Sequence, residues 1–186
     1  STGALDRGNG LNGILVGNSA GANIIGQAVA GGGNVVSGNN GNAGIEINGS
    51  TTGSNLVQGN IVGLNAAGNA ALANSGAGIL IDGGQLTTIG GTLAAARNVI
   101  SGNALQGIRI TANTATANIV QGNYIGTNVG GTTVIGNTRS GIQIDNGADS
   151  TQVGGTAAGT ENVIAGSGEY GIYLTDSGTI VNRIQG

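Results

Sequence analysis

The chain has 186 residues, of which 41 are Gly and only 7% are charged, and its net charge is −3. There is no Cys, which excludes disulfides and thiolate zinc sites, and no His. A weakly acidic chain without a basic stripe lacks the phosphate attraction that dominates nucleic-acid binding, so we predict no nucleic-acid partner. No apolar run approaches the roughly 18 residues of a membrane span, so we predict no membrane insertion.

One short phrase recurs six times along the chain. An Asn, or Ser167 in the last copy, is followed a few residues later by Gly-Ile-x-Ile or a close copy of it. The Gly of each pair falls at 13, 44, 78, 107, 141 and 171, so the steps are 31, 34, 29, 34 and 30. Short and long units alternate, which makes a double unit of about 64 residues the better period. A fixed period of this kind indicates one structural unit stacked on itself.

Each unit carries three short aliphatic runs bounded by Gly and Asn, which is the composition of strands. No stretch shows sustained helical periodicity. For one short and one long unit, in chain order, the predicted strands lie within residues 78–81, 87–91, 98–103, 107–110, 118–126 and 133–137.

Strand alternation explains the Gly-Ile-x-Ile pattern. Ile45 and Ile47 point to one face of their strand and Glu46 to the other. The flanking positions are always Ile, Val or Leu, which predicts a core face. The x position accepts any type, which predicts a face in solvent; across the six copies it is Leu15, Glu46, Leu80, Arg109, Gln143 and Tyr173.

Three strands per unit and no helix predict an all-β fold, a right-handed single-stranded parallel β-helix. We expect about six coils of about 32 residues in a single domain over residues 1–186, a rod of about 29 Å at roughly 4.8 Å per coil. Asn34 and Asn55 are 21 residues apart, so a narrow coil of about 21 residues is the alternative. We favour 32 because the Asn-to-Gly-Ile phrase marks every half of the double unit.

Gly and Asn are expected at the corners, where the backbone needs a positive φ or a close approach. Asn at equivalent corners can also form a ladder, in which each side-chain amide bonds to the coils above and below.

Three phrases, at residues 87–91, 98–103 and 118–128, resemble the right-handed parallel β-helix repeats of large bacterial secreted and surface proteins. The resemblance covers nearly the whole chain. It implies a pectate-lyase-like solenoid within a longer, extracellular or cell-surface, adhesin-like polypeptide. It does not imply an activity, since such repeats occur in enzymes and in adhesins.

The sequence does not favour catalysis. Polygalacturonase-like relatives use clustered Asp with His and an Arg-Ile-Lys segment, and this chain has no His and no adjacent Asp pair. Asp82 and Asp145 share a repeat position two coils apart, about 10 Å along the axis, a spacing that glycosidase carboxylates can have. Thr111 lies between them, and the repeat alone accounts for their spacing. We therefore predict no enzyme and no catalytic residue, with solvated Asp side chains as the simpler reading.

The sequence gives similarly weak evidence for a ligand site. Asp145, Asp149 and nearby carbonyls offer oxygen atoms of the type that calcium prefers, but an Asx turn explains them as well, and we predict no metal or cofactor. Tyr170 and Tyr173 flank Gly171-Ile172 as a candidate sugar platform or as plain surface residues. Scattered Arg residues are read as solubilising charge; Arg97 and Glu161 share a repeat position two coils apart, too far for an ion pair.

No capping element is apparent at either end of the repeat array, and an open terminal coil exposes unpaired strand edge. We expect self-association through the open solenoid ends, as part of a longer array or as stacked subunits. The predicted function is a non-catalytic extracellular stalk, adhesin segment or filament subunit. The alternative is a β-helix that binds or degrades an extracellular polysaccharide.

Overall fold

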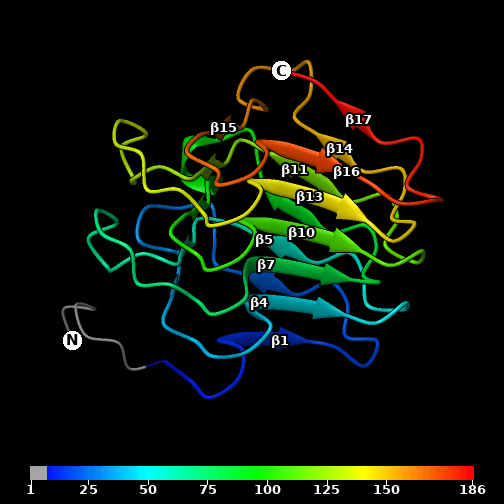
Figure 1. The fold of residues 1–186 in the computed structure, drawn as a ribbon, viewed down its shortest axis with the longest axis horizontal. Helices are drawn as coiled ribbons and strands as arrows, with labels where there is room; N and C mark the ends of the chain where they lie inside the picture. The colour runs from blue at the N-terminus through cyan, green and yellow to red at the C-terminus, as the bar shows by residue number, and fades with distance from the viewer. Residues whose placement is uncertain (1–7) are drawn as a thin grey trace.

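The chain winds into a parallel β-solenoid of about five turns, which the computed structural model describes for residues 8–186. The strands of the front sheet all run left to right while the chain climbs from β1 to β16, so the winding is right-handed as expected (Figure 1). The expected count of six coils is wrong. Six copies of the Gly-Ile strand enclose five turns, because a turn is the interval between two successive strands.

Three parallel sheets form the sides of the solenoid. The first contains β1 (Ile14–Val16), β4 (Ala43–Asn48), β7 (Ala77–Asp82), β10 (Ile108–Thr111), β13 (Ile142–Asp145) and β16 (Ile172–Leu174). The second contains β2 (Ile24–Ile25), β5 (Leu56–Val57), β8 (Thr88–Gly90), β11 (Ile119–Gln121), β14 (Gln152–Val153) and β17 (Arg183–Ile184). The third contains β3 (Val35–Val36), β6 (Ile61–Val62), β9 (Val99–Ile100), β12 (Tyr124–Ile125) and β15 (Val163–Ile164). A single 3-10 turn, η1 (Ala94–Ala96), is the helical segment of the described residues.

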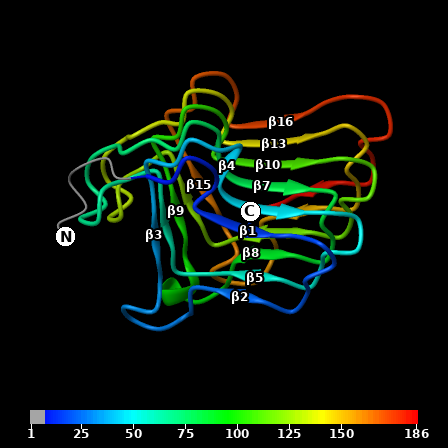
Figure 2. The same cartoon turned by 90° about the horizontal axis from the view of Figure 1, so that it is seen from below.

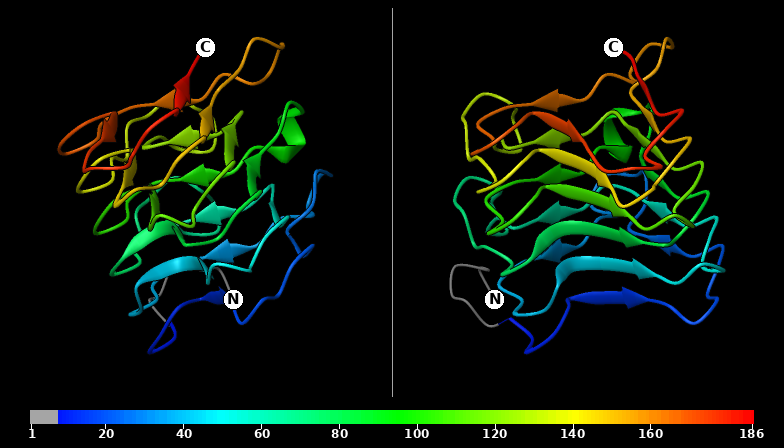
Figure 3. Two further views of the ribbon diagram at one scale, coloured as in Figure 1. Left: turned by 90° about the vertical axis from the view of Figure 1, so that its right-hand side faces the viewer. Right: turned by 45° about the vertical axis from the view of Figure 1, so that its right-hand side comes forward.

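The strand register confirms the wide coil. Ile14 pairs with Ile45 and Ile45 with Ile79, so one turn takes 31 and then 34 residues. Successive coils lie directly over one another from the first strand to the last (Figure 3, right). This register excludes the narrow coil of about 21 residues.

The alternation of short and long units comes from where the loops lie. In two coils the chain leaves the third sheet through a protruding loop, closed by antiparallel bridges between Leu64 and Ala71 and between Thr127 and Val134. In the other three coils the longer loop lies instead between the second and third sheets, as from β8 to β9. In Figure 2 the third sheet (β3, β9, β15) runs at a steep angle to the other two, with these loops at the corners.

The predicted core face is confirmed. Ile45, Ile47, Ile79 and Ile81 have no exposed surface, and neither have their equivalents in β10 and β13. Val57, Ile89 and Val120 from the second sheet and Val62, Ile100 and Ile125 from the third fill the same interior and are equally buried. A burial of this kind stabilises each side chain by about 1.5–3 kcal/mol relative to its exposed state.

The predicted Asn ladders are present at two corners. Before the third sheet, side-chain amides link Asn34, Asn60, Asn98, Asn123 and Asn162 in sequence at 2.9–3.1 Å. Before the first sheet, Asn9, Asn39, Asn74, Asn103 and Asn137 are linked in the same way at 2.8–2.9 Å. The Asn Oδ1 atoms mostly also accept the backbone N–H of the Asn one coil below, as Asn98 does from Asn60 at 3.0 Å. The ladders therefore join side chains and main chain into one hydrogen-bonded column.

The third corner breaks this pattern. Asn23 donates to Asn55 at 3.0 Å, but Thr87 follows where the next Asn would stand. The side chain of Thr87 bonds through its hydroxyl to the carbonyl of Gln85, and its backbone N–H donates to Asn118. As a result the Nδ2 atom of Asn55 is buried without a hydrogen-bond partner.

We expect Thr87→Asn to raise the free energy of unfolding by about 1 kcal/mol, because it supplies the acceptor that Asn55 lacks. The position accommodates Asn in the neighbouring coils, at Asn55 and Asn118. Equilibrium denaturant unfolding measures the change, and Thr88→Asn at the adjacent outward position is the matched control. A destabilised Thr87→Asn variant would show that the gap in the ladder is filled in another way.

Candidate functional site

A groove lies on the outer face of the first sheet, and we call it the outer groove. It has a volume of about 780 Å³ and crosses β1, β4, β7 and β10. Its floor is made by Leu15, Leu80 and Arg109, the x positions of β1, β7 and β10, and its wall by the segments that lead into the strands. The lining side chains include Leu11, Asn12, Leu15, Asn40, Asn42, Ser75, Leu80, Asp82, Leu105, Gln106 and Arg109.

The outer groove corrects one expectation. The x positions were predicted to face solvent, yet Glu46 is only 4% exposed and Leu80 8%. The entering segments are the reason, because Ala43 and Ala77 pair in register and bury Leu80 in a small apolar cluster outside the main core. Leu15 in the first described strand keeps the expected exposure, at 62%.

An ion pair between the buried Asp145 and Arg109, whose side chain is 35% exposed, lies at the far end of the groove. The Nε and Nη2 atoms of Arg109 donate to the two carboxylate oxygens of Asp145, at 3.0 and 3.2 Å. Gln143 also donates to Asp145 and accepts from Gln106 at 2.6 Å. Asp145 is 1% exposed, so the reading of a solvated surface Asp is wrong for this residue. Across residues 8–186 this is the only salt bridge.

Removing the arginine should be costly. We expect Arg109→Ala to lower the free energy of unfolding by about 2–3 kcal/mol, because it leaves a buried carboxylate without its cation. Arg139→Ala, at an exposed side chain one coil above, should change it by less than about 0.5 kcal/mol. Thermal or denaturant unfolding measures both. Adding Asp145→Asn to Arg109→Ala should restore part of the loss, and a double variant no better than the single one would argue against a charge effect.

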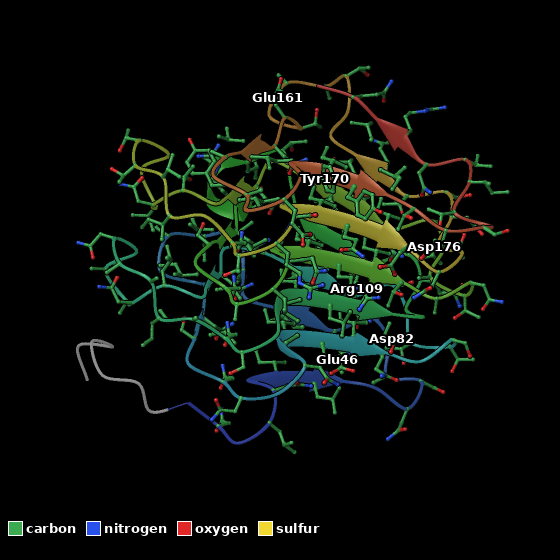
Figure 4. All side chains as sticks on the ribbon, in the orientation of Figure 1. Glu46, Asp82, Arg109, Glu161, Tyr170 and Asp176 are labelled. Atoms are coloured by element: carbon green, nitrogen blue, oxygen red, sulfur yellow. The ribbon has the colours of Figure 1, made fainter. Side chains whose placement is uncertain are left out.

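The other two acids of this face differ in their partners. Glu46 accepts hydrogen bonds from the side chains of Asn12 and Asn48, the second at 2.9 Å, so its carboxylate is satisfied. Asp82 is half-buried, lines the groove and has no side-chain hydrogen bond or ion pair within the described chain. As predicted, Thr111 lies between Asp82 and Asp145 in the register. Figure 4 shows Glu46, Asp82 and Arg109 on successive strands of the front sheet.

A second, smaller hollow lies farther along the same face. Tyr170 and Tyr173 stack on one another with ring centroids 4.7 Å apart and planes 24° apart. Together with Arg139, Gln143 and Glu169 they line about 490 Å³. The sequence identified the two rings as a candidate platform, but not their stacking or their charged neighbours.

The oxygen-rich segment at Asp145 and Asp149 does not bring its carboxylates to one centre. Asp145 binds Arg109, while Asp149 accepts a hydrogen bond from Thr116 at 2.7 Å. No group of three or more acidic side chains gathers anywhere in residues 8–186 in a way that could hold a metal ion. The Asp82 and Asp145 carboxylates, in turn, have different surroundings, one unpaired and one neutralised.

Arg97 and Glu161 make separate contacts, as their two-coil separation predicts. The guanidinium of Arg97 lies 4.0 Å from the ring centroid of Tyr124, a cation–π contact, and its Nε donates to the carbonyl of Gly122. Glu161 accepts a hydrogen bond from the backbone N–H of Gly159. Arg97 and Arg109 therefore each have a specific partner, where the sequence indicated only scattered charge.

Comparison with known proteins adds no family to this description, since no family, curated protein or solved structure matches the chain. The parallel β-solenoid architecture therefore stands on the structure itself. Over residues 8–186 no helix has the length and apolar character needed to cross a bilayer.

Proposed function

We propose that this chain is a non-catalytic structural β-solenoid, a rigid extracellular or cell-surface stalk, adhesin segment or filament subunit. The observation that supports it best is the pair of Asn ladders, which tie every described coil to the next. Three parallel sheets add a main-chain ladder on each side, so little of the chain outside the loops can move independently of its neighbours.

The test is to locate the native protein and observe its shape. Antibodies against residues 8–186 should label intact cells that produce the protein, and electron microscopy should show a rod of constant width. An intracellular protein, or a compact globular particle without a rod, would overturn the proposal.

We further propose that coils of this type extend by head-to-tail stacking. The ladders are polar, because each Asn donates to the Oδ1 of the Asn on its C-terminal side and accepts from its N-terminal side. Only a contact between unlike ends continues this polarity. In the last described coil Leu174 and Ile184 stand at core positions, in register with Ile144 and Val153, and are 36% and 51% exposed, which leaves apolar surface for such a contact.

Sedimentation velocity over a range of concentrations tests the stacking. Self-association should weaken in Asn162→Asp, which keeps the acceptor for Asn123 but removes the amide that donates to the carbonyl of Val120 and has a second hydrogen for a following coil. A wild-type segment that stays monomeric at high concentration would contradict it.

A second candidate function is binding of an extracellular polysaccharide, which the stacked Tyr170 and Tyr173 favour. Aromatic faces are good platforms for sugar rings, and Arg139 and Glu169 beside them offer polar contacts. Glycan arrays that include acidic polysaccharides test it, with Tyr170→Ala as the variant expected to lose binding. Lyase and hydrolase assays on the same polysaccharides separate binding from degradation.

A further inference from the structure

The outer groove combines an apolar floor with a single unpaired charge. Leu80 and Leu105 lie on its floor and wall, and Leu11 and Leu15 continue the apolar surface toward β1. None of the residues that line it is aromatic. A sugar would therefore lack a stacking platform here, whereas an aliphatic side chain would find one.

The balance of charge in the groove is negative. Arg109 is already neutralised by Asp145 in a two-bond ion pair, while Asp82 faces the groove with neither a cation nor a donor among the described residues. Glu46 adds a second negative charge behind the floor, held only by amide donors. The groove therefore attracts a cationic group rather than an anionic one.

The shape of the groove suits an extended chain. It crosses four strands, which is three steps of about 4.8 Å or roughly 14 Å, about the length of four extended residues at 3.3 Å each. The wall carries neutral polar side chains that can bond to a peptide backbone. Asn42 is exposed on this wall and makes no side-chain hydrogen bond in the described structure.

We propose that the outer groove binds an extended peptide segment in which a basic side chain lies next to an apolar one. The cation pairs with Asp82, and the apolar side chain packs among Leu15, Leu80 and Leu105. This inference goes beyond the structural role proposed above, because it assigns a specific partner to one side of the solenoid and does not depend on its ends.

The test uses a capped pentapeptide with a central lysine between two leucines, titrated into the protein by calorimetry or NMR. Asp82→Asn should weaken binding about tenfold or more, since it removes the charge that pairs with the ammonium. The variant should fold, because Asn48 stands at the same position one coil earlier. Asp149→Asn is the matched control, a half-buried Asp elsewhere on the solenoid, and it should leave the affinity unchanged.

Leu105→Ala should weaken the same peptide several-fold, because it removes part of the apolar wall. A peptide with glutamate in place of lysine should not bind. Equal binding of the lysine peptide to wild type and to Asp82→Asn would overturn the proposal, as would no binding at all. Preference for the glutamate peptide would also overturn it, and would make Arg109 the anchor of an anionic ligand.

Discussion

Asn98→Ala is expected to lower the free energy of unfolding by about 3–5 kcal/mol, as large a cost as truncating a buried aliphatic side chain. The Oδ1 atom of Asn98 accepts from both nitrogens of Asn60 at 3.0 Å, and its Nδ2 donates to Asn123 and to the carbonyl of Val57. The truncation removes all four bonds. It leaves buried donors in the coil below without their acceptor, and water cannot reach them to compensate.

Equilibrium unfolding in urea or guanidinium, followed by circular dichroism, measures this loss. Asn42→Ala is the matched control, since the Asn42 side chain is exposed and unbonded in the described structure, and it should shift stability by less than about 0.5 kcal/mol. Similar losses in the two variants would mean that the ladder adds little beyond the β-sheets. An unchanged m-value would show that the transition itself is the same in both proteins.

The fold could be predicted because its determinants are local and repeated. Each Gly-Ile-x-Ile copy predicts a strand and the face of it that points inward, and the positions of the Asn residues predict where the corners lie. Six copies of one rule agree with one another, which a single copy could not do. The number of turns was predicted wrongly, because each copy of the phrase was counted as one coil. Six successive strands are separated by five turns, so the array has one turn fewer than it has copies.

The site was harder to predict because it depends on neighbours in different coils. Arg109 and Asp145 occupy the x position of one strand and the position two residues later in the next, so they meet only across the diagonal of the sheet. Read one strand at a time, each looks like an isolated surface charge. The signal was present in the register, since opposite charges on adjacent coils with an offset of two residues are diagonal partners.

The burial of Glu46 and Leu80 has a different origin. Their strands, β4 and β7, begin one residue before the Gly of the Gly-Ile phrase, at Ala43 and Ala77. The small side chains at these two positions let the entering segments pack against the outside of the sheet. The alternation of residues within one strand does not show whether a loop packs on its outer face. Alternation alone therefore predicted that the outer face of β4 and β7 is in solvent.

The Asn ladders and the outer groove constrain the residue types of the same coils differently. The linked residues of the two ladders are all Asn, because each must both donate and accept, whereas the outer face accepts Leu, Glu, Arg, Gln and Tyr at one repeat position. The scaffold therefore stays constant while the surface chemistry varies from coil to coil. In such a molecule a binding site can arise on one side without any change in the hydrogen bonds that hold the stack.

Gly90→Ala is expected to lower the free energy of unfolding by about 3–5 kcal/mol, the sum of a backbone strain and a steric clash. Gly90 ends β8 with φ at +90°, a conformation that L residues rarely adopt. A methyl group there would also overlap the carbonyl oxygen of Gln121 and lie only 2.6 Å from the Oδ1 of Asn123. Neither neighbour can yield, because the first is backbone in the adjacent strand and the second belongs to an Asn ladder.

Two other glycines separate these contributions. Gly31 has φ at +76° but nothing within 4 Å of the added methyl, so Gly31→Ala should cost only the left-handed strain, about 1 kcal/mol. Gly10 has neither a left-handed φ nor a neighbour within 4 Å, so Gly10→Ala should be neutral or slightly stabilising through the entropy of the unfolded chain. Denaturant unfolding of the three variants measures the loss of unfolding free energy. If the close approach of coils at the corner dominates, the loss is largest at Gly90, smaller at Gly31 and smallest at Gly10. Equal losses at Gly90 and Gly31 would instead place the whole cost in the backbone conformation, and the tight contact between coils would add nothing.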